Sequence, residues 1–258
     1  MSAAAAARLQ NKTILITGAS AGIGRSTAIE FAKTAPNHNL KIIITARRID
    51  ALKKVDTLAE DISNETPGVK VLPVQFDVSD PQQVKDLVEK LPEEYRDINV
   101  LVNNAGLVRG LAQSPNINSA DIHEMYNTNV HGLINLTQAI LPTFLARSPA
   151  SGSIAGREPY PGGSIYCSTK AAVRAYTDSL RRELISTRIR VIEIDPGQVE
   201  TEFSVVRFYG DEEKARKVYE GVEPLGPEDI AEVVVFAATR RENTVVADVL
   251  VLPSHQGG

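Results

Sequence analysis

The stretch TILITGASAGIG, residues 13–24, decides the fold of this chain. Its first five residues are apolar or β-branched, as expected of a strand that is buried on both faces. Glycines at positions 18, 22 and 24 then allow a tight turn close to a pyrophosphate, and a helix expected over 23–34 offers its unpaired N–H groups to that anion. The spacing is GxxxGxG, not the GxGxxG of the usual fingerprint. A strand, a glycine turn and a helix in this order predict a nucleotide-binding unit.

The alternation of strands and helices continues along the chain. Apolar, β-rich runs predict further strands at 40–46, 69–77, 98–104, 189–195 and 245–252. Helical patterns lie between them at 50–64, 79–91, 121–145, 164–186 and 227–239, with a weaker helical tendency over 205–221. Pro73 suggests an irregular or edge strand, and Ser79 is expected to cap the helix that carries Pro81 in its first turn.

This order of elements predicts an α/β fold with a single Rossmann-type, doubly wound parallel sheet and helices on both faces. The chain shows no linker and no internal repeat, so residues 1–258 are expected to form one domain, with 1–10 flexible. Ligands in such folds bind beyond the carboxyl ends of the strands. The loops that follow the predicted strands are therefore expected to line one crevice.

Composition excludes several classes of function. The 28 basic and 32 acidic side chains give a net charge of −4 without a basic block, which argues against nucleic acid as a partner. Cys167 is the one cysteine, so no intrachain disulfide forms and a reducing, cytoplasmic location fits. The four histidines show no zinc-like spacing, and no metal site is expected. No run approaches the ~18 apolar residues of a membrane span, and MSAAAAARLQNK is not expected to act as a signal peptide.

The residues after the second predicted strand favour NADP(H) over NAD(H). An acidic residue at this place holds the ribose hydroxyls of NAD, whereas an arginine holds the 2′-phosphate of NADP. Here Arg47 and Arg48 come first and Asp50 follows later. The alternative is that both arginines flank a solvated turn. Asp77, after the third strand, is placed either to meet the adenine edge or to cap a helix.

Tyr166 and Lys170 lie four residues apart on a predicted helix and therefore share a face. A lysine ammonium beside a phenol stabilises the phenolate. A tyrosine in that position acts as a proton donor and acceptor near neutral pH. The Tyr-x-x-x-Lys pattern alone is common by chance.

Six motifs in one order make a specific resemblance. TGASAGIG (17–24), NNAG (103–106), NVHG (129–132), a serine 13 positions before the tyrosine, YCSTK (166–170) and PGQVET (196–201) resemble the classical short-chain dehydrogenase/reductase family over essentially the whole chain. SIAGREPYPGGSIYCSTK (153–170), VETEFSVVRF (199–208) and the arginines after the second strand are closest to the NADP-dependent 3-hydroxy acid dehydrogenases, of the serine and L-allo-threonine type.

The resemblance implies a role for each matching residue. Tyr166 would be the general acid and base, Lys170 would hold the nicotinamide ribose, and Ser153 would hydrogen-bond the substrate carbonyl oxygen. Asn129 would hold a water that links Lys170 to solvent. The residues expected to bind the cofactor are Gly18, Ser20, Gly22, Ile23, Gly24, Arg47, Arg48, Asp77, Asn103, Ala105, Gly106, Tyr166, Lys170, Pro196, Gly197, Val199 and Thr201.

One segment departs from the family pattern. Where the family places a buried strand before the serine, this chain has ARSPASGS (146–153). The segment is shorter than that of the family by about four residues, which is most of a typical strand of about 5–6 residues. In one interpretation the segment runs extended and keeps Ser153 in place. In the other the fold or the activity is impaired, and the chain binds NADP without turnover.

Residues 202–226, called the lid segment below, are expected to cover the substrate. Arg207 within it is expected to pair with a substrate carboxylate, because arginine forms bidentate pairs with carboxylates; the alternative is a solvent-facing arginine. The expected substrates are serine, L-allo-threonine and 3-hydroxyisobutyrate, with another carbonyl compound as the runner-up. The family also implies pairing of the helices at 121–145 and 164–186, and hence a homotetramer.

Overall fold

The computed structural model describes residues 3–47, 49–146, 151–152 and 164–256. Six parallel strands form one sheet in the order β3-β2-β1-β4-β5-β6, and β7 pairs with β8, also in parallel. The strands are β1 (Thr13–Ile16), β2 (Leu40–Ala46), β3 (Val69–Gln75), β4 (Val100–Val102), β5 (Ser151–Gly152), β6 (Arg190–Val191), β7 (Glu193–Pro196) and β8 (Asp248–Val251). The predicted doubly wound α/β fold is confirmed.

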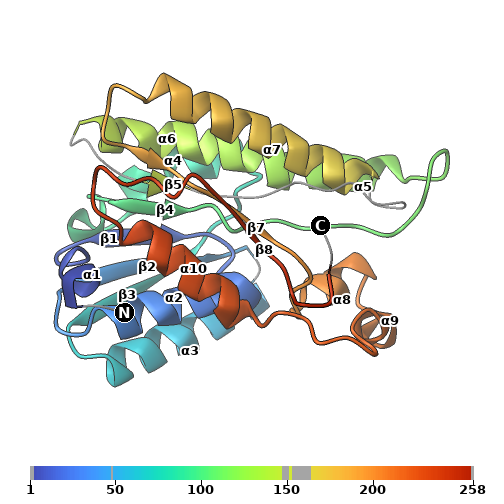
Figure 1. Ribbon diagram of the computed structural model, residues 1–258, viewed down its shortest axis with the longest axis horizontal. Coiled ribbons are helices and arrows are strands. Elements are labelled where there is room, and N and C mark those ends of the chain that lie inside the picture. Colours follow the sequence, from blue (N-terminus) through green and yellow to red (C-terminus); the bar gives the residue numbers. More distant parts are fainter. Residues whose placement is uncertain (1–2, 48, 147–150, 153–163, 257–258) are drawn as a thin grey trace.

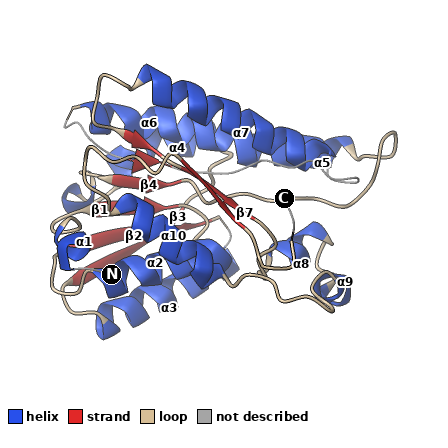
Figure 2. Ribbon diagram, viewed as in Figure 1, coloured by secondary structure: helices blue, strands red, loops and turns tan. Residues whose placement is uncertain are grey.

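Helices cover both faces of the sheet, which forms the middle layer in Figure 2. One face carries α2 (Gly22–Thr34), α3 (Ile49–Glu65) and α10 (Pro227–Ala238), and the other carries α4 (Pro81–Lys90), α6 (Leu133–Leu145) and α7 (Ser164–Glu183), as Figure 1 shows. Phe31 and Val234 belong to the first core layer, whereas Leu136, Ile140 and Leu180 belong to the second. All four residues of β1 are buried, because helices pack on both sides of it.

The strand order determines that the predicted crevice lies between the loops that follow β1 and β4. The chain leaves β1 toward β2 and β3, and then returns to pair β4 on the other side of β1. This reversal separates the loops after β1 and β4, and ligands of such sheets bind at that point. β3 is an edge strand, in agreement with the prediction from Pro73, which lies opposite Ile44 in the register.

A two-residue strand, β5, occupies the central position of the sheet, where the shortened segment 146–153 had left open whether a strand forms. In β5, Ser151 lies opposite Val100 of β4 on one side and Arg190 of β6 on the other. The ladder between β4 and β6 is therefore continuous through β5. Residues 147–150 and the predicted catalytic Ser153 lie outside the described residues.

Within residues 1–10, α1 (Ala3–Ala7) forms, and Leu9 is buried against the first core layer. The expected N-cap of α4 differs from the structure. Asp80, not Ser79, caps α4, because the Asp80 carboxylate accepts from the backbone N–H groups of residues 82 and 83 at 2.9 and 3.2 Å. The Ser79 hydroxyl is used elsewhere and donates to Asp77 at 2.7 Å.

The helix expected over 121–145 is interrupted. It consists of α5 (Ser119–Tyr126), a π-helical turn (Asn127–Gly132) and α6. Gly132 in this turn faces the chain after β3, where an added Cβ would lie 2.8 Å from the carbonyl oxygen of Val78. Such π-helical turns frequently mark functional sites, and this one carries Asn129. None of the described helices is long and apolar enough to cross a membrane.

Candidate active site

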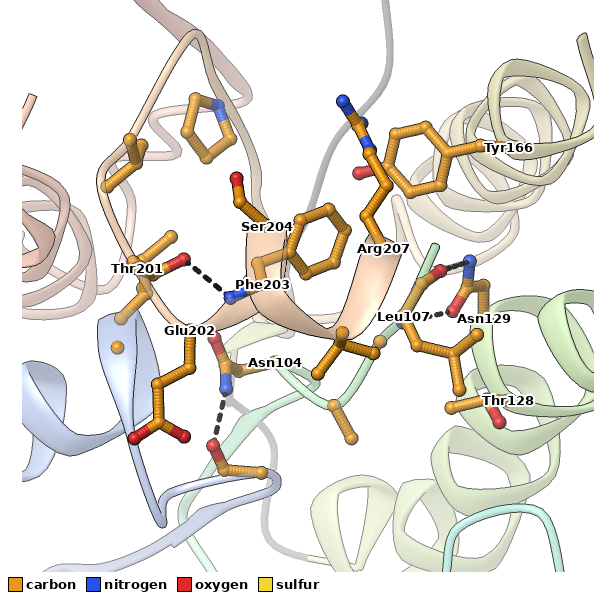
Figure 3. A pocket seen from close by; sticks show the side chains of 18 of the residues that line it. Asn104, Leu107, Thr128, Asn129, Tyr166, Thr201, Glu202, Phe203, Ser204 and Arg207 are labelled. Atoms are coloured by element: carbon orange, nitrogen blue, oxygen red, sulfur yellow. Dashed lines mark hydrogen bonds between the residues drawn. The ribbon is translucent and has the colours of Figure 1, made fainter. Parts of the chain in front are cut away.

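A cleft of about 2100 Å³ lies beyond the carboxyl ends of the strands. Most residues predicted to act in binding or catalysis line it, and Figure 3 shows part of this cleft from close by. They are Gly18, Ser20, Gly22, Ile23, Arg47, Asp77, Asn103, Ala105, Gly106, Asn129, Tyr166, Lys170, Pro196, Gly197, Val199, Thr201 and Arg207. Ser153 and Arg48 lie outside the described residues.

The glycine turn is held by the strand beside it. The Thr17 hydroxyl accepts hydrogen bonds from the backbone N–H groups of Asn104 and Ala105, both at 3.0 Å. The Asn104 side chain donates in return to the carbonyl oxygens of Thr17 and Gly18, at 2.8 and 3.1 Å. Gly18 has φ +65°, which favours glycine, and an added Cβ would lie 3.0 Å from Ala105.

Gly24 does not line the cleft, although it belongs to the glycine motif. An added Cβ at Gly24 would lie 2.5 Å from the Asn104 side chain and 2.6 Å from the Gly18 carbonyl oxygen. Its role in the structure is therefore close packing of α2 against the glycine turn. The sequence named Gly24 with the cofactor-binding residues, but left out Asn104, which the NNAG motif contains.

The start of α2 is open to an anion. Ala21 precedes the helix, no side chain caps its first turn, and that turn contains no acidic residue. The unpaired N–H groups of the turn therefore remain available for hydrogen bonds, and the helix dipole favours a negative charge there. A pyrophosphate fits these donors, and the glycine backbone leaves room for its approach.

Arg47, which follows β2 directly, lines the same cleft as the glycine turn. Its guanidinium is 3.9 Å from the Asp77 carboxylate and 3.7 Å from that of Glu124. These are long contacts, and 39% of the side chain remains exposed. The residues present thus provide a phosphate-binding helix end and a weakly held arginine in one cleft, which fits a phosphorylated dinucleotide.

Tyr166 and Lys170 lie on the first turns of α7 and face the cleft together. The Lys170 ammonium is 5.5 Å from the centroid of the Tyr166 ring. The other side of the tyrosine contacts Phe203 of the lid segment edge-on, with 5.8 Å between the ring centroids. The phenol is thus oriented by a cation on its own helix and by an aromatic ring from the opposite wall.

Asn129 is buried within the π-helical turn and fixes the loop that follows β4. Its side-chain oxygen accepts from the backbone N–H of Leu107 at 2.9 Å, and its amide group donates to the Leu107 carbonyl at 2.8 Å (Figure 3). The same amide group donates to the Thr169 hydroxyl at 3.2 Å, beside Lys170 on α7. Asn129 therefore connects the β4 loop to the helix that carries the tyrosine and the lysine.

The lid segment contains α8 (Phe203–Arg207) and α9 (Glu212–Lys217). Phe203 and Val206 pack on a small apolar cluster of the opposite wall, formed by Leu107, Val108 and Met125. The Arg207 side chain extends from α8 in Figure 3 and lines the same cleft as Tyr166. The structure thus places the predicted substrate residue and the predicted catalytic tyrosine in one cleft.

Sequence reasoning missed a second arginine in this region. Arg109 donates two hydrogen bonds to the Glu124 carboxylate, at 2.7 and 2.9 Å. This hydrogen-bonded guanidinium holds the pKa of Glu124 below its ordinary value, and Arg47 lowers the pKa further by a smaller amount. Nothing in the local sequence joins the two residues, because they lie on separate elements and meet only in the fold.

Tyr219, at the end of the lid segment, was also missed. Its hydroxyl donates to the carbonyl oxygen of Val199 at 3.0 Å and lies 2.6 Å from the Ser204 hydroxyl. Val199 follows β7 in the PGQVET motif and is one of the residues expected to bind the cofactor. Tyr219 therefore joins α8 to the loop after β7.

Comparisons with known proteins agree with this geometry. Residues 12–209 match the family model described as short chain dehydrogenase. The chain is 53% identical to the NADP-dependent 3-hydroxy acid dehydrogenase of Schizosaccharomyces pombe, over 97% of this chain and 96% of that protein. It is 38% identical to sulfoacetaldehyde reductase 2 of Chromohalobacter salexigens, over 94% of each chain. Among solved structures, the closed form of a serine dehydrogenase complexed with NADP⁺ superposes with a TM-score of 0.87 at 33% identity, over 95% of this chain and 96% of that chain.

Proposed function

The chain belongs to the short-chain dehydrogenase family, and we propose that it transfers a hydride between NADP(H) and a small 3-hydroxy acid. One observation carries the proposal. Tyr166 and Lys170 face the same cleft as the glycine turn and the open N-terminus of α2. A proton-transfer pair beside a dinucleotide site suits the interconversion of an alcohol and a carbonyl.

The cofactor would be held along the whole cleft. The glycine turn and the first turn of α2 would hold the pyrophosphate, and Arg47 would hold the 2′-phosphate. Val199 and Thr201 would contact the nicotinamide amide. The nicotinamide, when bound, supplies or accepts the hydride. The relatives named for NADP, including one solved with NADP⁺, support this choice of cofactor.

The protein's own residues would move the proton. In oxidation, the Tyr166 phenolate takes the proton of the substrate hydroxyl as the carbonyl forms, and in reduction the phenol returns it to the carbonyl oxygen. The Lys170 ammonium stabilises the phenolate. Asn129, hydrogen-bonded to Thr169 beside Lys170, is suited to order a water that passes the proton on. Ser153 is proposed as the donor to the carbonyl oxygen, on the resemblance alone.

Arg207 is the proposed contact for the substrate carboxylate. Both named relatives act on small substrates, a 3-hydroxy acid in one case and sulfoacetaldehyde in the other. Carboxylates and sulfonates are anions that a guanidinium binds through two parallel hydrogen bonds. Reduction of another small anionic carbonyl compound is therefore the second candidate function, favoured because Arg207 and Tyr166 line the same cleft.

We also propose a cytoplasmic homotetramer in which residues 202–226 close over the substrate. Exposed apolar side chains on α10 and on β8 support association, since Phe236 is 46% and Leu250 41% exposed. The single cysteine suits a reducing compartment. Light scattering after size exclusion tests the assembly, and Phe236→Arg is expected to shift the protein to a smaller species.

The deciding experiment follows NADP⁺ reduction at 340 nm with L-serine, L-allo-threonine and 3-hydroxyisobutyrate, with NAD⁺ in parallel. NADPH oxidation with sulfoacetaldehyde tests the second candidate. Turnover that depends on NADP⁺ supports the proposal and shows that the shortened segment still delivers a working site. A folded protein that binds NADPH but turns over none of these substrates would instead support a non-catalytic binding protein.

A further inference from the structure

Glu124 of α5 lies between two arginines that belong to different parts of the cleft. Its carboxylate accepts two hydrogen bonds from Arg109, at 2.7 and 2.9 Å. The oxygen that accepts the longer of these bonds lies 3.7 Å from the nearest guanidinium nitrogen of Arg47. The arginine that follows β2 and an arginine that follows β4 thus share one carboxylate.

Arg109 fastens the lid segment to this carboxylate. Its second terminal nitrogen donates to the carbonyl oxygen of Val206 at 3.1 Å, near the end of α8, and the same oxygen accepts from the backbone N–H of Tyr209 at 3.2 Å. Its guanidinium also lies 5.8 Å from the ring centroid of Tyr209. The neighbouring Gly110 adds a backbone hydrogen bond to the Arg207 carbonyl at 2.9 Å. Arg109 is therefore one of the contacts that hold the end of α8.

Arg47 is held much less firmly than Arg109. Its contacts with Asp77 and Glu124, at 3.9 and 3.7 Å, exceed hydrogen-bond distances. A phosphate offers a guanidinium short, charge-assisted and bidentate hydrogen bonds. An incoming 2′-phosphate would therefore draw Arg47 away from Glu124.

On the basis of the proposed function, we propose that Glu124 is a positioning residue that couples the 2′-phosphate of the cofactor to the lid segment. Two guanidinium groups that share one carboxylate repel each other and compete for its charge. When Arg47 turns to the phosphate, Glu124 is left to Arg109, and Arg109 holds Val206 more firmly. NADP(H) then closes the lid segment more tightly than NAD(H), in addition to binding with higher affinity.

The coupling is tested with two nucleotide fragments that carry no nicotinamide, so that any effect on α8 comes from the adenosine end of the cofactor. Adenosine 2′,5′-bisphosphate and adenosine 3′,5′-bisphosphate have the same charge and differ only in the position of one phosphate. Both are added to saturation, and hydrogen exchange of the peptide that covers residues 203–210 is measured by mass spectrometry. We expect the 2′,5′ isomer to slow this exchange about two- to five-fold relative to the 3′,5′ isomer. This factor corresponds to the stabilisation that one weak ion pair provides.

Glu124→Gln keeps the size of the side chain and removes its charge. In this variant we expect faster exchange of residues 203–210 without nucleotide, and equal exchange with the two isomers. Asp121→Asn is the matched control, because Asp121 lies on the same helix and accepts a hydrogen bond from Tyr209 at 2.5 Å. It should raise the exchange with both isomers by the same factor and preserve the difference between them.

The outcomes separate this inference from the proposed function. A protein that fails to bind the 2′,5′ isomer, by calorimetry, would refute NADP(H) as the cofactor and the coupling with it. Binding of both isomers with equal exchange in the wild-type protein overturns the coupling alone, and this comparison needs no variant. A difference that persists in folded Glu124→Gln would show that another residue carries the coupling.

Discussion

The Lys170 ammonium lies 5.5 Å from the centre of the Tyr166 ring, one helical turn further along α7. Because both side chains project from one rigid helix, their relative position does not depend on a loop. Phe203 of the lid segment contacts the same ring edge-on at 5.8 Å. The position of the lid segment and the orientation of the tyrosine are thus linked by a direct contact.

Tyr166→Phe is expected to lower kcat by roughly 10²- to 10⁴-fold, the usual contribution of general acid–base catalysis. The ring and its contact with Phe203 are retained, so NADPH affinity should change little. Turnover at 340 nm and NADPH fluorescence titration measure the two effects. Tyr126→Phe is the control, because the Tyr126 hydroxyl bonds Ser168 at 2.9 Å and does not face the cleft. Equal losses of turnover in the two variants would contradict the assignment.

Arg47→Ala is expected to weaken NADPH binding about 10- to 100-fold, the range for losing a hydrogen-bonded charge partner. NADH has no 2′-phosphate, so its affinity should stay nearly constant. Dissociation constants for both nucleotides from fluorescence titration check this. Lys53→Ala, at an exposed position of α3, is the control for a general loss of positive charge. An equal loss of affinity for NADPH and for NADH would show that Arg47 does not bind the 2′-phosphate.

Arg207→Ala is expected to raise the KM for hydroxy acids by roughly 10-fold or more, because a charge-assisted bidentate contact is lost. Arg207→Lys keeps the charge but not the bidentate geometry, so its KM should lie between those of the wild type and Arg207→Ala. Arg216→Ala, on the exposed side of α9, serves as the control. An unchanged KM in Arg207→Ala would remove this residue from substrate binding.

Gly24→Ala is expected to destabilise the protein by about 1–3 kcal/mol through overpacking. The added methyl group would lie 2.5 Å from Asn104 and 2.6 Å from the Gly18 carbonyl. Gly106→Ala is a matched comparison, since its nearest neighbour is the Asn129 side-chain oxygen at 3.4 Å, an ordinary contact. Thermal unfolding of the two variants should differ clearly, and similar melting temperatures would argue against tight packing at Gly24.

Glu193 is expected to make stability depend on pH. It is 1% exposed in β7, and burial, followed by the nearby charge of Asp195, raises its pKa to about 7. Because the folded-state pKa lies above the unfolded value, the folded protein binds this proton more tightly. The contribution of Glu193 to the free energy of unfolding is therefore fully present below about pH 4.5 and is lost as the pH rises through 7.

Glu193→Gln removes this titration while keeping the shape of the side chain. We expect the variant to melt roughly 5 °C above the wild type at pH 8, with a small difference at pH 5. Scanning calorimetry at both pH values measures the change. A constant difference between the two proteins across this range would show that Glu193 does not titrate there.

Elements that depend on local sequence were predicted well. The buried β1, the parallel alternation and the edge position of the strand with Pro73 follow from apolar runs and proline chemistry, and the structure has all three. The N-cap of α4 was predicted wrongly, because Ser79 and Asp80 are both good caps and only the contact of Ser79 with Asp77 decides between them. The π-helical turn was missed, since hydrophobic periodicity does not reveal one extra residue in a turn.

By itself, the sequence determined the fold class, through the alternation of strands and helices along the chain. It also determined the glycine turn and the pairing of Tyr166 with Lys170, because each of these depends on residues within one segment. Only the tertiary structure decided that Arg109 holds Glu124 and Val206, and that Tyr219 holds Val199. These contacts join elements whose separation depends on strand order and helix packing. A hydrogen bond needs its two atoms within about 3 Å, and no local pattern specifies that distance between distant segments.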